Sequence, residues 1–326
     1  MTGRFKANNP TNNFLLLVYG LLLKLPLFLN PRVPEMQSAD GPLYSSLIIV
    51  LKGAFAGFPA MFSIITFILL YIQAIGFNKA VNDHRMLQKP NYLTGMAYLL
   101  ITSLFSEWFS LSAALIVNTM LIWVWSKLCT LHNNPAAKTT IYNIGLVIGI
   151  ACFFYYPAII FTLLFIAGIA IIRPFKLNEW LIGLTGIITS FYVYAAWIFL
   201  SGQWTTFHFP QISISIPVFF ETKWALAAIL LVVLTMLLGV FFIQQNMRRQ
   251  IVQTRKSWYL VYLYLLVASF VPFINATGSF SSWILIAVPV SLVTASALFY
   301  PDKKWFPLAI QWGMVAICIA VGYLVK

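Results

Sequence analysis

The residues of this sequence that can do chemistry are its few carboxylates. Only seven Asp and Glu residues occur among 326, and four of them, Glu35, Asp40, Glu107 and Glu221, stand in short polar stretches between long apolar runs. A carboxylate at the mouth of a cavity can act as a general base or hold a divalent metal. Glu35 lies close enough to Asp40 in sequence to be its partner. We therefore expect any catalysis to depend on Asp40, Glu35 and Glu107.

Each of these carboxylates also has a purely structural explanation. Asp40 precedes a Gly-Pro pair, and proline favours the first turn of a helix, so Asp40 can instead be the cap of a helix over residues 43–56. Glu107 stands beside Trp108 in a tight turn, where the two residues can cap a helix or anchor the chain at a membrane surface. The sequence leaves both explanations open for both residues.

Four further side chains are candidates for binding a substrate: Lys24, Arg32, His208 and Glu221. Arg32 can clamp a phosphate group or form an ion pair with the neighbouring acids. Lys24 lies inside an apolar run, where a charge either faces a polar interior or extends to the lipid head groups. A lone histidine such as His208 is more often a structural hydrogen-bonding residue than a catalytic one. No cluster has the spacing of metal ligands, so no metal site is predicted and the cofactor is unknown.

Membrane helices must position these residues, because the composition excludes a water-soluble protein. Hydrophobic residues make up 61% of the chain and charged residues 8%, whereas soluble domains carry about 25% charge. A soluble enzyme, a disordered chain and a secreted disulfide scaffold are excluded. The predicted fold class is all-α, a polytopic transmembrane helical bundle in one integral-membrane domain, residues 1–326. About eleven spans are expected, over residues 14–29, 59–77, 92–105, 109–126, 141–156, 157–172, 180–200, 224–243, 259–273, 282–300 and 306–325.

The short spans are predicted to form two hairpins with tight outer turns, at residues 106–108 and 156–157. Pro157 suits such a turn because it lacks a backbone N–H and restrains the residue before it. The competing interpretation is one kinked helix over residues 141–172. That helix would be about 48 Å long, which is too long for a single crossing.

The basic residues fall mainly on one side of these spans. With the N-terminus inside, fifteen of the twenty Lys and Arg residues lie in inner segments and four in outer segments. Cytoplasmic loops retain such residues, so the N-terminus is predicted inside and the C-terminus outside. The net charge of +13 then requires no nucleic-acid partner, because the charges are spread over many segments. In the first outer loop, residues 43–56 are predicted as a helix lying in the membrane interface.

Several sequence stretches carry a resemblance to known proteins. They are Leu21–Leu29 (LLLKLPLFL), Asp40-Gly41-Pro42, Lys89–Tyr92, Leu99–Leu104 and Ile172–Phe175. With them the chain resembles an uncharacterised family of polytopic inner-membrane proteins from Bacteroidota over nearly its whole length. Its architecture also resembles the membrane glycosyltransferases that use polyprenyl-phosphate sugars. That likeness implies Asp40 as the base and Glu107 as a second acid or metal ligand, although the chain lacks the paired acidic motif and soluble outer domain of many such enzymes.

The function expected from these observations is in cell-envelope biogenesis, in the inner (cytoplasmic) membrane of a bacterium. The protein would have an outer-facing cavity and transfer a glycosyl group from a lipid-linked donor, with membrane lipids and a polyprenyl-phosphate lipid as partners. Phosphate-binding and dinucleotide-binding loops are absent, which argues against ATP-driven transport. Two alternatives stay open: a non-catalytic subunit of a membrane protein complex, and a lipid or small-molecule transporter. The sequence does not decide whether the protein is an enzyme.

Overall fold

The computed structural model describes residues 2–134, 137–202, 204, 213–214, 223–274, 280–303 and 305–324. Within these ranges the chain is helical, with no strand and two isolated bridges, Asp40–Tyr155 and Ile214–Ile274. The all-α prediction is therefore confirmed for this part of the chain. The α-helices are α1 (Thr2–Phe5), α2 (Thr11–Leu23), α3 (Leu25–Leu29), α4 (Pro42–Ala54), α5 (Ala60–Asp83), α6 (Leu93–Ile101), α7 (Ala113–Cys129), α8 (Ala137–Phe154), α9 (Phe161–Ile172), α10 (Leu177–Leu200), α11 (Lys223–Met247), α12 (Val252–Phe270), α13 (Ala287–Phe299) and α14 (Trp305–Leu324). Five short 3₁₀ helices join them, η1 (Ser106–Phe109), η2 (Thr130–Asn133), η3 (Tyr156–Ile160), η4 (Val271–Phe273) and η5 (Phe280–Ile286).

Eight helical stretches in the described ranges are long and apolar enough to cross a membrane. They are Ala60–Asp83, Ala113–His132, Ala137–Phe154, Leu177–Leu200, Trp224–Met247, Val252–Phe273, Phe280–Phe299 and Trp305–Gly322. Each of them overlaps one of the predicted spans. The other three predicted spans, 14–29, 92–105 and 157–172, fall on shorter helices. The chain thus has the helices of a multi-pass membrane protein, while the number of crossings and their orientation stay predictions.

The centre of the bundle is formed by α6 and α13. Every residue of both helices is buried, and α13 packs against α6 and against α11. The nine residues of α6 span only about 14 Å, less than half of a bilayer core of about 30 Å. The chain therefore leaves helical geometry at Thr102, inside the bundle, and continues through η1 into α7.

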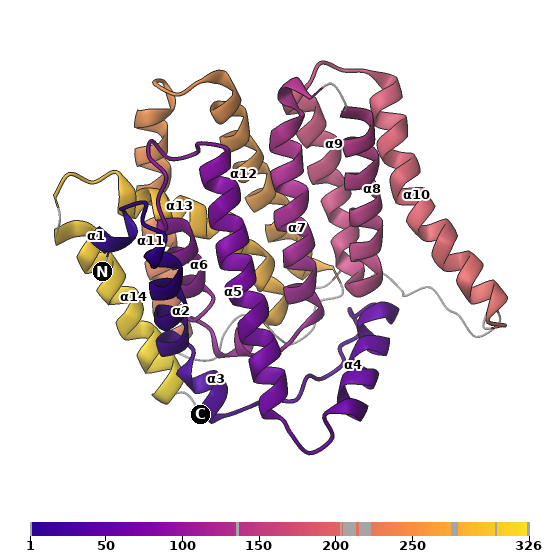
Figure 1. Cartoon of the computed structure of the whole chain (residues 1–326), viewed down its shortest axis with the longest axis horizontal. Coiled ribbons are helices and arrows are strands. Elements are labelled where there is room, and N and C mark those ends of the chain that lie inside the picture. The colour runs from indigo at the N-terminus through magenta and orange to yellow at the C-terminus, as the bar shows by residue number, and fades with distance from the viewer. Residues whose placement is uncertain are drawn as a thin grey trace.

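The helices α8 and α10 lie side by side (Figure 1), and they approach closely because glycines face each other. A Cβ atom on Gly145 would stand 2.2 Å from the carbonyl oxygen of Gly183, a distance that no side chain tolerates. Small residues allow such backbone contact between membrane helices. Beyond this contact α10 diverges from the bundle (Figure 1), and its outward side carries exposed apolar residues such as Tyr192 and Trp197.

Both tight turns predicted from the sequence are present as 3₁₀ helices. Residues 106–109 form η1, and α8 ends at Phe154 before η3, which holds Pro157 near its start. The single kinked helix over residues 141–172 is therefore wrong. The predicted interfacial helix is present as α4, although its depth in the membrane stays a prediction.

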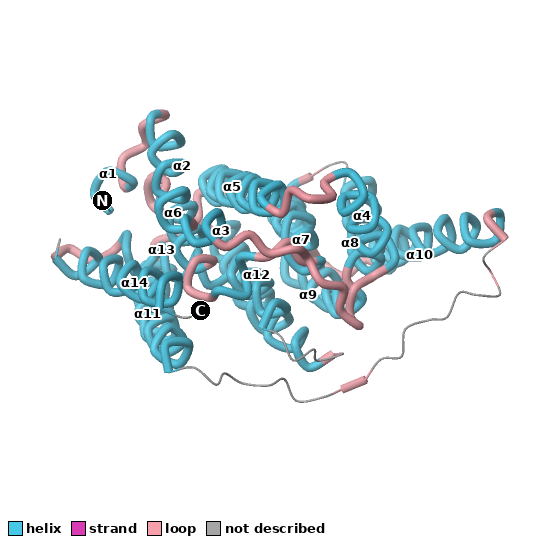
Figure 2. The backbone as a smooth tube through the Cα atoms, turned by 90° about the horizontal axis from the view of Figure 1, so that it is seen from below, coloured by secondary structure: helices cyan, strands magenta, loops and turns pink. Residues whose placement is uncertain are grey.

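Segment 30–41 connects α3 with α4 and crosses one end of the bundle (Figure 2). Together with η1 and the turn between α8 and η3, it forms what we call the outer end, after the predicted orientation. The capping explanation for Asp40 is wrong. The residue in the cap position of α4 is Gly41, and the Asp40 carboxylate accepts a hydrogen bond from the backbone N–H of Gln37, outside that helix.

Candidate functional site

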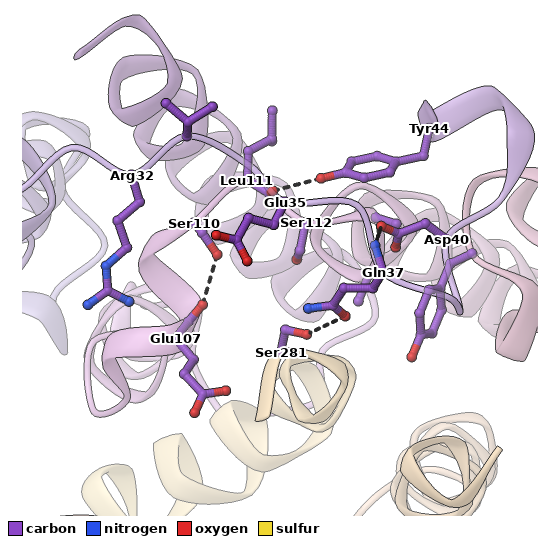
Figure 3. A pocket seen from close by; sticks show the side chains of 14 residues that line it. Arg32, Glu35, Gln37, Asp40, Tyr44, Glu107, Ser110, Leu111, Ser112 and Ser281 are labelled. Atoms are coloured by element: carbon purple, nitrogen blue, oxygen red, sulfur yellow. Dashed lines mark hydrogen bonds between the residues drawn. The ribbon is translucent and has the colours of Figure 1, made fainter. Parts of the chain in front are cut away.

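A cavity of about 460 Å³ lies at the outer end (Figure 3), within the size range of small-molecule sites. Its walls come from segment 30–41, the first turn of α4, η1 and the beginning of α7, with single residues from the α8–η3 turn and from η5. Four of the residues predicted from the sequence line it: Arg32, Glu35, Asp40 and Glu107. The fold therefore brings all three predicted catalytic acids to one cavity.

Asp40 is held in place by backbone pairing between segment 30–41 and the end of α8. The N–H of Gly41 donates to the carbonyl of Phe154 at 2.8 Å, and the N–H of Tyr156 donates to the carbonyl of Ala39 at 3.1 Å. A Cβ atom at position 41 would stand 2.1 Å from the Phe153 carbonyl oxygen. Only glycine permits this close approach, which explains the residue that follows Asp40.

The Asp40 carboxylate is half-buried at the cavity wall. Its Oδ2 accepts a hydrogen bond from the backbone N–H of Gln37 at 2.8 Å, which stabilises the charged form. Burial acts in the opposite direction and is the larger effect, so the pKa of Asp40 rises to about 6. A carboxyl group with this pKa is a better proton acceptor than an ordinary aspartate, and at neutral pH it is still mostly ionised.

Two further residues that hold this wall were not predicted from the sequence. Tyr44, in the first turn of α4, is buried, and its hydroxyl donates to the carbonyl of Leu111 at 2.8 Å. Burial and the nearby Asp40 charge raise the pKa of Tyr44 above its ordinary value. Ser281 donates to the Gln37 side chain at 3.2 Å and so connects segment 30–41 with η5. Tyr44 could have been noticed as the residue one helical turn after Asp40, whereas no sequence signal points to Ser281.

Arg32 and Glu35 are exposed side chains of the cavity wall. The Arg32 guanidinium donates to the carbonyl of Ser106 at 3.3 Å. Among the described residues, the only ion pair within 4 Å is Arg173–Glu179, so Arg32 forms no such pair with a described carboxylate. The guanidinium is thus available to an anionic group that enters the cavity.

Glu107 connects η1 to η5. Its carboxylate accepts a hydrogen bond from the backbone N–H of Phe280, and the indole Nε1 of Trp108 donates to the carbonyl of the same residue at 3.0 Å. The rings of Trp108 and Phe280 stack with centroids 5.6 Å apart. Burial raises the pKa of Glu107, while the Phe280 N–H and the Arg32 charge oppose the rise. The carboxylate points toward η5 (Figure 3) and thus holds the two segments of the cavity wall together.

Lys24 lies outside the cavity. It is fully buried between α2 and α3, its Nζ donates to the carbonyl of Thr102 at 3.0 Å, and it stands 5.3 Å from the ring centroid of Phe109. The side chain thus faces the protein interior and does not extend to the head groups. The two remaining predicted residues, His208 and Glu221, lie outside the described residues. Within the described ranges, no three His, Cys, Asp or Glu side chains are grouped as metal ligands would be.

One solved structure shares this fold, the crystal structure of ArnT from Cupriavidus metallidurans bound to undecaprenyl phosphate. The two chains superpose with a TM-score of 0.56 at 10% sequence identity, over 96% of this chain and 64% of that one. The chain thus spans somewhat less than two thirds of its structural relative, and at this identity the likeness shows the fold alone. No curated protein matches the sequence. Residues 43–326 match the Family of unknown function (DUF6427), and because the match takes in most of the chain, the protein belongs to that family.

Proposed function

We propose that this protein is a membrane glycosyltransferase that takes a sugar from a lipid-linked donor in the cavity at its outer end. The observation that carries the proposal is Asp40, a half-buried carboxylate with a pKa near 6. It lines a cavity of about 460 Å³ together with Arg32, which has no carboxylate partner among the described residues. A base and a guanidinium in one cavity suit glycosyl transfer from a phosphate-linked donor.

In the proposed reaction an acceptor hydroxyl attacks the anomeric carbon of the donor sugar. The new bond joins the acceptor oxygen to that carbon, and the bond from the carbon to the phosphate oxygen of the donor breaks. Asp40 takes the proton of the hydroxyl as the bond forms. The electron pair of the broken bond stays on the lipid phosphate, and Arg32 stabilises that developing negative charge with a planar pair of N–H donors.

The fold of the relative supports the lipid part of the proposal. ArnT was crystallised with undecaprenyl phosphate, so this arrangement of helices accommodates a polyprenyl phosphate in at least one protein. A role in cell-envelope biogenesis in the inner membrane of a bacterium, with the cavity facing outward, follows if the donor is of that kind. A non-catalytic subunit of a complex, the main alternative from the sequence, gives no reason for a base and a guanidinium to line one cavity.

The experiment uses the full-length protein in nanodiscs, supplied with polyprenyl-phosphate sugars and a panel of sugar and lipid acceptors. Release of polyprenyl phosphate is the readout. Asp40→Asn, which keeps the size of the side chain, is expected to lower turnover by about 10²- to 10⁴-fold, the contribution of a general base. The matched control is Asp83→Asn, an exposed aspartate at the end of α5, which is expected to leave turnover unchanged. Turnover by Asp40→Asn equal to that of the control would refute Asp40 as the base, and no release of polyprenyl phosphate by the parent protein would refute the proposed function.

A further inference from the structure

A second, wholly apolar pocket of about 320 Å³ lies beside the cavity. We call it the apolar groove. Four residues of α11 line it: Ile229, Val232, Val233 and Met236. The last three follow Ile229 by three, four and seven positions, so all four lie on one face of the helix. This stripe extends about 10 Å along the helix axis. The opposite wall is one face of η5 and α13, and residues of α6 and of the α6–α7 connection, Ile101, Phe105 and Trp108, complete the lining.

The cavity and the apolar groove share one wall, made of η1 and the start of η5. Neighbouring residues of this wall face opposite sides. Glu107 and Ser281 line the cavity, whereas Trp108 and Phe280 line the apolar groove. The hydrogen bonds from Trp108 to Phe280 and from Phe280 to Glu107 hold the two segments together. A polar and an apolar compartment thus meet along a single row of residues.

This arrangement matches the chemistry of one class of molecule, an anionic head group on a long apolar chain. We infer that the apolar groove binds the isoprenoid chain of a polyprenyl phosphate whose phosphate group lies in the cavity near Arg32. The rings of Trp108, Phe280 and Trp283 stack on one another and give the groove a rigid aromatic lining, against which the planar, methyl-branched alkene units of such a chain can pack. A saturated acyl chain has no such planar units. The identity of the head group rests on the proposed function, whereas the location of the chain rests on the groove.

The test is photochemical labelling of the full-length protein in nanodiscs with a polyprenyl phosphate that carries a diazirine in its chain. Labelled peptides are expected from the groove-facing parts of η1, α11 and α13. Met236→Trp fills the groove with a larger side chain and is expected to lower this labelling about tenfold, a loss of about 1.4 kcal/mol of binding free energy. Val233→Trp is a second variant on the same stripe. Leu237→Trp places the same ring on the neighbouring, 63% exposed position of α11 and is expected to leave the labelling unchanged.

The outcomes separate the chain site from the reaction. If Met236→Trp and Val233→Trp were both labelled as strongly as the parent protein, the inference would be overturned. Equal labelling of these peptides by a diazirine phosphatidylglycerol, undisplaced by excess polyprenyl phosphate, would also overturn it, because the groove would then hold an ordinary bilayer lipid. Asp40→Asn is expected to keep the labelling and lose turnover. Groove labelling without any turnover by the parent protein would refute the transfer reaction and keep the chain site, whereas full turnover by Asp40→Asn would refute only the role of Asp40 as the base.

Discussion

Replacing Asp40 by Asn measures how much the buried, charged carboxylate at the cavity wall lowers the free energy of unfolding. Burial raises the pKa of Asp40 from 3.8 to about 6, which corresponds to about 3 kcal/mol. Since the side chain is partly exposed, about 2 kcal/mol is the better expectation. The folded state binds the proton more tightly than the unfolded chain. This group therefore lowers stability progressively as the pH rises from 3.8 through 6, and the full cost is present above pH 6.

Asn removes the charge and keeps an oxygen for the Gln37 N–H, so Asp40→Asn is expected to be about 2 kcal/mol more stable than the parent at pH 7.5. Near pH 4, where the parent carboxyl is mostly protonated, the two proteins are expected to melt together. The assay is the melting temperature of each protein in detergent at both pH values, with Asp83→Asn as the control at an exposed position. A variant that is less stable than the parent at both pH values would refute the reasoning, since Asp40 would then be a structural hydrogen-bond acceptor. Gained stability together with lost turnover is the expected behaviour of a catalytic residue.

Two further substitutions test how the chain positions its parts. Gly41→Ala is expected to destabilise the protein by about 3 kcal/mol or more, because the new methyl group meets the Phe153 carbonyl. The matched Gly53→Ala, where nothing lies within 4 Å, is expected to be neutral or stabilising by about 0.5–1 kcal/mol in melting experiments. Arg173→Met removes the partner of the buried Glu179, 2.9 Å away, and is expected to cost about 3–5 kcal/mol. Replacing Glu179 by Gln as well should recover much of that loss, and a double variant as unstable as the single one would contradict this account.

The helical architecture was predictable because lipid imposes a strict rule on the chain. Backbone groups in a bilayer must be satisfied within the segment, so long apolar runs such as those at 59–77 and 224–243 had to become helices, and they did. The short runs were harder to interpret. Residues 92–105 read as one span, yet only Leu93–Ile101 are α-helical. Thr102 and Ser103 bond carbonyls of the last turn of α6, but the other partners of that helix end, Lys24 and Cys318, come from distant parts of the chain and could not be predicted.

Part of the cavity was predictable for a similar reason. In a chain with so few carboxylates, those in outer segments stand out, and Asp40, Glu35 and Glu107 line one cavity. The hydrogen bond from Phe280 to Glu107 joins residues far apart in sequence, and no sequence pattern encodes such a contact. The contact of Ser281 with Gln37 is of the same kind. The apolar groove was also invisible, because its stripe on α11 looks the same in sequence as a surface that faces lipid.

Lys24 links the sequence argument to the architecture of the site. Among the basic residues it alone stood inside a predicted span, and it lies at the C-terminal end of α6, where its ammonium group donates to the Thr102 carbonyl. A cation at a helix C-terminus complements the helix dipole and satisfies a carbonyl that has no partner in the helix. Thr102, Ser103 and Cys318 satisfy other carbonyls of the same helix end. With these carbonyls satisfied, the chain can leave the helix inside the bundle and form η1. η1 is a wall of both the cavity and the apolar groove. Lys24 lines neither of them, yet the shape of both depends on it, because it stabilises the helix end from which the chain enters η1.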